Sequence, residues 1–83
     1  MVRTSFSGRE IAEVLQKHGF RRAGRAGSHL KLRYEHPDTD EVRIVTVPMV
    51  SADEIPTGTL QSIANQCGAN DFHEWCRWID ENQ

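Results

Sequence analysis

The feature that most limits how this chain can fold is the alternating run at residues 29–34. Apolar side chains occupy every second position from Leu30 to Tyr34, and the positions between them are basic or imidazole. Because successive side chains of a β-strand point to opposite faces, this period of two predicts a strand with one packed face and one exposed face. The exposed face carries His29, Lys31 and Arg33, and an imidazole beside two cations suits a ligand that bears phosphates.

A second run, residues 42–47, is rich in β-branched side chains and predicts a partner strand. We expect an antiparallel register that places Leu30 opposite Val47 and Leu32 opposite Val45, since this joins the apolar faces of the two strands. Residues 20–25 have a weaker strand signal and predict a short first strand.

Three helices are predicted from apolar residues at helical spacing. Residues 8–18 follow a Ser7 to Glu10 capping box and end before Gly19. A second helix opens at Pro56, where threonines are available as caps, and ends at Gly68. A third helix, over about residues 71–81, has Asn70 as its expected cap.

The predicted order is α-β-β-β-α-α, an α+β fold in which helices cover one face of a three-stranded antiparallel sheet and leave the other face open. With 83 residues, residues 1–83 are expected to form one domain with a thin core. The chain has no apolar run of about 18 residues and no apolar segment typical of a signal peptide near its first residue, so we expect a cytoplasmic protein without a membrane partner.

Charge is distributed unevenly along the chain. Residues 1–36 carry a net charge of +5 and residues 37–83 a net charge of −7, although the whole chain carries only −2. An anion responds to charges within about 8–10 Å, so the local excess decides which ligands bind. We therefore expect RNA to contact a set of five basic residues: Arg21, Arg22, Arg25, Lys31 and Arg33.

The two cysteines, Cys67 and Cys76, do not have the spacing of metal ligands, and buried reduced thiols are the expected state. A metal site formed by these cysteines and His73 is the alternative. We expect no metal and no other cofactor.

Several short motifs form a recognisable pattern in a fixed order. They are Ser7-Gly8, Gly19-Phe20, Gly27-Ser28-His29, Val47-Pro48, Ile55-Pro56-Thr57-Gly58-Thr59-Leu60, Ile63 and Gln66. Over roughly residues 5–68, this pattern resembles the HicA toxins of toxin–antitoxin modules. The chain departs from that pattern at Val50, where many members of the family carry a second histidine.

The resemblance implies a small endoribonuclease with a fold like that of double-stranded-RNA-binding domains. Such enzymes cleave mRNA without a metal, and a HicB-like antitoxin binds the toxin and covers its active site. The essential histidine of the family corresponds to His29, and Gly27 and Ser28 match the residues that position it.

One histidine can cleave RNA because the ribose 2′-hydroxyl is a nucleophile already present in the substrate. His29 is then the general base, or the acid that protonates the leaving oxygen, and Lys31 and Arg33 hold the phosphate. Taken alone, His29 also fits a histidine at a strand edge that is hydrogen-bonded to a loop carbonyl.

Two other functions are compatible with the sequence. A non-catalytic RNA-binding module would use the arginines and tolerate loss of His29. A protein-interaction module would use the surface around Trp75 and Trp78.

Overall fold

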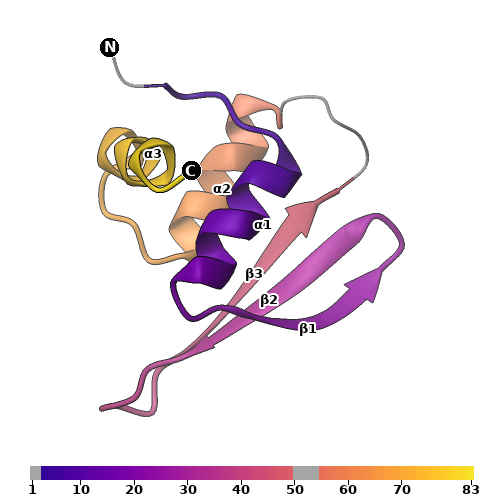
Figure 1. The fold of residues 1–83 in the computed structure, drawn as a ribbon, viewed down its shortest axis with the longest axis vertical. Coiled ribbons are helices and arrows are strands. Elements are labelled where there is room, and N and C mark those ends of the chain that lie inside the picture. Colours follow the sequence, from indigo (N-terminus) through magenta and orange to yellow (C-terminus); the bar gives the residue numbers. More distant parts are fainter. Residues whose placement is uncertain (1–2, 50–54) are drawn as a thin grey trace.

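The computed structural model describes residues 3–49 and 55–83, which form three helices and one sheet (Figure 1). In chain order the elements are α1 (Gly8–Lys17), β1 (Arg21–Ala26), β2 (His29–Glu35), β3 (Val42–Pro48), α2 (Thr57–Gln66) and α3 (Phe72–Glu81). The predicted α+β class and the order α-β-β-β-α-α are confirmed. The departure from the family pattern at Val50 lies outside the described residues.

The sheet is antiparallel with the strand order β1-β2-β3, so β2 is central and the other two strands form the edges. Leu30 pairs with Val47 and Leu32 with Val45, which confirms the predicted register. The apolar alternation of β2 and β3 fixes this register, because a slip by one residue would turn every core side chain toward solvent.

The helices lie on one side of the sheet (Figure 1). We call the face that they cover the helix side and the opposite face the outer face. Burial alternates along β2, with Leu30 and Leu32 buried and His29, Lys31 and Arg33 exposed. The helix α3 packs against α2 and is separated from the sheet by the other two helices (Figure 1).

Among the described residues, sixteen buried side chains form one continuous core between the helices and the sheet. They are Phe6, Ile11, Ala12, Val14, Leu15, Leu30, Leu32, Val45, Val47, Ile55, Leu60, Ile63, Ala64, Trp75, Cys76 and Ile79. No helix in the described part of the chain is both long enough and apolar enough to cross a lipid bilayer.

The capping box predicted for α1 is present. The Ser7 hydroxyl accepts a hydrogen bond from the Glu10 backbone N–H (3.3 Å), and the Glu10 carboxylate accepts one from the Ser7 N–H (3.0 Å). The helix ends at Lys17, with His18 as its C-cap, and Gly19 then adopts φ +95°, the left-handed conformation that glycine favours.

The other two helices begin differently from the prediction. The cap of α3 is Asp71, one residue after the predicted Asn70, and the Asp71 carboxylate accepts a hydrogen bond from the Glu74 N–H (3.0 Å). A carboxylate gains more than an amide at this position, since the helix dipole is positive there. The N-cap of α2 is Pro56, and no threonine side chain caps that helix.

Candidate active site

His29 is the first residue of β2 and follows the two-residue turn Gly27-Ser28. Gly27 adopts φ +60°, which allows the chain to reverse within two residues. The Ser28 carbonyl accepts a hydrogen bond from the Met49 N–H (2.6 Å), which ties the turn to the end of β3. At the two predicted positioning residues the structure thus shows backbone features: the positive φ of Gly27 allows the turn, and the Ser28 carbonyl anchors it.

The imidazole of His29 is accessible on the outer face. In the ladder His29 lies between Ala26 of β1 and Pro48 of β3, two side chains too short to cover it. Within residues 3–49 and 55–83 the ring has no hydrogen-bond partner and no ion pair. The alternative in which His29 is held by a loop carbonyl is therefore not the arrangement observed among these residues.

Lys31 and Arg33 follow His29 along the same face, and both are exposed. Alternate residues of a strand are about 7 Å apart, so Lys31 lies about 7 Å and Arg33 about 14 Å from His29 along β2. These spacings allow one phosphate to contact His29 and Lys31 together. They place Arg33 beside the next part of an extended ligand.

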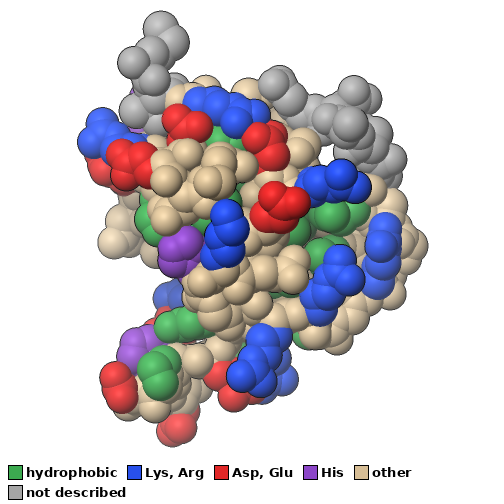
Figure 2. All heavy atoms as spheres, in the orientation of Figure 1, with side chains coloured by type: hydrophobic (Ala, Val, Ile, Leu, Met, Phe, Trp, Pro, Cys, Tyr) green, Lys and Arg blue, Asp and Glu red, His purple; other side chains and the backbone are tan. Residues whose placement is uncertain are grey.

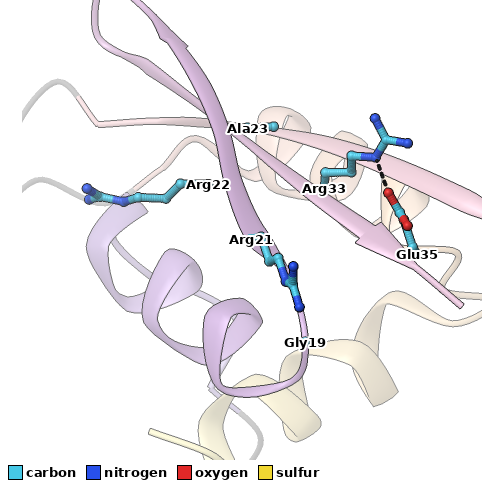
Figure 3. A pocket seen from close by; sticks show the side chains of 6 residues that line it. All are labelled: Gly19, Arg21, Arg22, Ala23, Arg33 and Glu35. Carbon is cyan, nitrogen blue, oxygen red and sulfur yellow. Dashed lines mark ion pairs between the residues drawn. The ribbon is translucent and has the colours of Figure 1, made fainter. Parts of the chain in front are cut away.

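Arg33 already forms an ion pair with Glu35. Its Nε lies 3.0 Å from Glu35 Oε1, in an exposed ion pair with 49% and 67% of the two side chains accessible (Figure 3). Exposed pairs of this kind contribute little, about 0–1 kcal/mol, so an incoming phosphate can replace the carboxylate. In the described part of the chain Lys31 forms no ion pair, which makes it the more available cation.

An open hollow of about 510 Å³ lies at the far end of the β1–β2 hairpin from His29. It is lined by Gly19, Arg21, Arg22, Ala23, Arg33 and Glu35. Arg21 and Arg33 are opposite each other in the ladder and approach this hollow from the same face, whereas the Arg22 side chain points away from both (Figure 3).

An irregularity in β1 divides the basic residues between the two faces. The ladder pairs Arg22 with Leu32 and then Gly24 with Lys31, which leaves Ala23 as an extra residue, the mark of a β-bulge. After the bulge, Arg25 pairs with Leu30.

Because paired residues point to the same face, Arg22 and Arg25 lie on the helix side and Arg21 lies on the outer face with Lys31. Figure 2 shows basic side chains over the hairpin, basic and acidic ones together over the helices, and acidic ones at the β2–β3 loop. The structure thus brings His29, Lys31, Arg33 and Arg21 to one face and turns the remaining two arginines to the other.

The sequence reasoning missed one contact at the free edge of β3. The Gln66 side chain of α2 accepts a hydrogen bond from the Thr46 backbone N–H (2.9 Å), which covers the edge of β3 opposite Lys31. Val42 and Ile44, on the same strand, expose 45% and 47% of their surface. The predicted register of β2 and β3 already places Ile44 on the outer face, whereas the only signal for Gln66 was its place in the motif pattern.

Both cysteines are free thiols, with Cys76 buried and Cys67 half-buried. Burial raises the pKa of the Cys67 thiol to about 11, against smaller lowering contributions from Trp75 and the charge of Arg43. Within residues 3–49 and 55–83 no three His, Cys, Asp or Glu side chains come together as metal ligands would, and the alternative site at His73 does not assemble there.

A comparison with protein-family models matches residues 8–69 to the HicA toxin of bacterial toxin–antitoxin systems. The match covers 62 of the 83 residues, from the start of α1 to just beyond α2, and includes the whole sheet. The helix α3 lies outside it. A comparison with curated proteins gave no match.

Proposed function

The chain belongs to the HicA toxin family, and on that premise we propose that this toxin is an endoribonuclease that cleaves mRNA at His29 without a metal ion. The observation that carries the proposal is the exposed position of His29 on the same face as Lys31, opposite the face that the three described helices cover. A ligand on such a face can be a long polymer, which an enclosed cavity would exclude. An mRNA substrate implies action in the cytoplasm.

The chemistry requires only the groups on this face. The ribose 2′-oxygen attacks the adjacent phosphorus, the bond from phosphorus to the 5′-oxygen breaks, and the products carry a 2′,3′-cyclic phosphate and a 5′-hydroxyl. His29 takes the proton of the 2′-hydroxyl, or gives a proton to the leaving 5′-oxygen, and water exchanges the other proton. Lys31 stabilises the charge that develops on the phosphate oxygens.

The test compares purified wild-type protein with His29→Ala on an mRNA transcript. General acid or base catalysis is worth about 10²–10⁴-fold, so we expect the cleavage rate to fall by that factor while the melting temperature stays the same. Products of the wild type should end in 2′,3′-cyclic phosphate, and an excess of EDTA should leave the rate unchanged. Equal rates for the two proteins would refute the role of His29.

A HicB-like antitoxin is the proposed protein partner of the outer face. Exposed Val42 and Ile44 lie beside the basic row of β2, and an apolar patch next to charges fits a protein better than it fits RNA. An antitoxin surface with apolar and acidic side chains could bind both parts. Co-expression with the neighbouring reading frame should relieve toxicity and give a complex that co-purifies; absence of both effects would contradict this pairing.

The second candidate is an RNA-binding module without catalysis. The arginines of the helix side favour it, because they can bind phosphates on the face of the sheet opposite to His29. In that case His29→Ala would have no effect on the fate of the RNA, and charge-removing changes at the arginines would weaken binding.

A further inference from the structure

The bulge at Ala23 determines where the second group of arginines lies. Without an extra residue, the pairing of Arg21 with Arg33 would continue along β1 and place Arg25 opposite His29, on the outer face. The bulge moves Arg25 one position, so that it pairs with Leu30 and shares the helix side with Arg22. Arg25 is therefore one ladder position from His29 but points to the opposite face.

Both arginines are available to a ligand. They are exposed because β1 is an edge strand, and within residues 3–49 and 55–83 neither has an acidic partner. The Arg25 Nε donates a hydrogen bond to the Gly27 carbonyl (3.2 Å), which holds this guanidinium at the turn that leads to His29.

We propose that an RNA strand bound along the outer face continues round the edge of β1 and places further phosphates on Arg22 and Arg25 at the helix side. This inference rests on the proposed function and adds to it the path of the substrate. Cations on both faces of one hairpin can be engaged by a single polyanion only if it passes round the free edge or the turn. Arg25 lies beside the turn, one ladder position from His29, so a strand that leaves His29 can reach it there.

This path requires the RNA to be single-stranded where it crosses the edge. A double helix such as DNA has a persistence length of about 50 nm and resists sharp bending. The two faces of a single sheet are separated by only about 10 Å, the spacing at which sheets stack. A duplex therefore cannot fold round the edge of β1. A single strand can, and it contacts basic side chains through its backbone without regard to sequence.

The experiment measures RNA binding in the His29→Ala background, where the RNA stays intact. The test variant carries Arg22→Gln and Arg25→Gln. The control carries Lys17→Gln and Arg77→Gln, which removes the same charge from α1 and α3, away from the hairpin. The probes are single-stranded RNAs of about 4 and about 16 nucleotides, the range of site sizes of single-strand-binding domains, and a blunt RNA duplex.

Loss of two phosphate contacts lowers the slope of log affinity against log salt by about 1.4 for a single strand. We expect that change for the long single strand with the test variant, and no change for the short strand or with the control. An equal slope for test variant and parent on the long strand would overturn the inference. So would an effect confined to the duplex, because the helix side would then be a separate duplex site.

Two further measurements keep the interpretation clear. Arg22→Gln alone leaves the turn contact of Arg25 in place, and it should lower the slope by about 0.7 if the path is correct. Cleavage by proteins with native His29 tests the proposed function separately. A wild type that cuts RNA, with arginine variants that bind normally, would refute the path alone, whereas a binding change without any cleavage would refute the nuclease alone.

Discussion

The rings of His18 and Trp78 pack against each other, with centroids 4.7 Å apart and planes inclined by 58°. His18 is the C-cap of α1, and its Nδ1 lies 2.8 Å from the Val14 carbonyl oxygen, so the imidazole is fixed against its own helix. Trp78 comes from α3, the helix outside the residues that match the family. The ring pair therefore connects α3 to the C-terminal end of α1, within the segment that matches the family, and it gives Trp78 a structural role.

We expect Trp78→Ala to destabilise the protein and to leave the active site unchanged. Loss of a half-buried indole and its ring contact should cost about 2 kcal/mol of unfolding free energy. Chemical denaturation measures this cost, and Arg77→Ala, at an exposed neighbouring position, is the control. A variant of unchanged stability would show that α3 is held elsewhere.

Lys31 should matter more for cleavage than Arg33. Lys31 is the nearer cation to His29 and has no ion pair among the described residues, whereas Arg33 pairs with Glu35. A hydrogen bond to a charged group is worth about 1.5–3 kcal/mol, so Lys31→Gln should lower kcat/KM by about 10- to 150-fold, and Arg33→Gln by less. Steady-state cleavage of one RNA by both variants measures the two kcat/KM values. A larger loss for Arg33→Gln than for Lys31→Gln would show that Lys31 is not the main phosphate contact.

Gly8 and Gly58 each lie in the first turn of a helix but should respond oppositely to alanine. A Cβ at Gly8 would overlap the Pro48 carbonyl oxygen, whereas a Cβ at Gly58 would meet no atom within 4 Å. Gly8→Ala should therefore lower the melting temperature, because the end of β3 must move. Gly58→Ala should leave stability unchanged or raise it by up to about 1 kcal/mol, since alanine loses less backbone entropy. Thermal melts of the pair measure the contrast, and equal shifts would contradict the close approach at Gly8.

The thiol of Cys67 should contribute to a loss of stability in alkali. Its pKa is raised from 9.0 to about 11 in the folded protein, so the unfolded chain ionises first. The contribution to stability is complete below pH 9 and declines as the pH rises towards 11, by at most about 1.4 kcal/mol per pH unit. Unfolding free energies of wild type and Cys67→Ala are measured at pH 8, 9.5 and 11. The slope of unfolding free energy against pH should be steeper for the wild type. Identical slopes would be inconsistent with a buried thiol.

Ile44→Thr should weaken the antitoxin complex without weakening cleavage. The change keeps a β-branched side chain in the strand but removes part of the exposed apolar surface beside Arg33. We expect the antitoxin to dissociate faster, as measured with one partner immobilised on a sensor surface. The rate of RNA cleavage should be unchanged. If cleavage falls instead and the complex is unaffected, this surface belongs to the RNA site.

Local sequence patterns determined most of the fold. The alternation of β2 and β3 set both the strands and their register, since a buried face admits only one pairing of Leu30 and Leu32 with the valines of β3. The capping box of Ser7 and Glu10 set the start of α1. The exposure of His29 followed from the same alternation, because Leu30, the next residue of the strand, had to be buried.

The tertiary structure determined features that the alternation of apolar and polar residues does not predict. A bulge at Ala23 depends on how an edge strand twists against its neighbour, and it turned Arg25 from the face of His29 to the face of the helices. The pairing of His18 with Trp78 joins residues sixty positions apart, and the bond from Thr46 to Gln66 joins a strand edge to a helix. Such contacts depend on the packing of whole elements, so the sequence determined which residues are exposed, and only the packed chain determined which of them share a face.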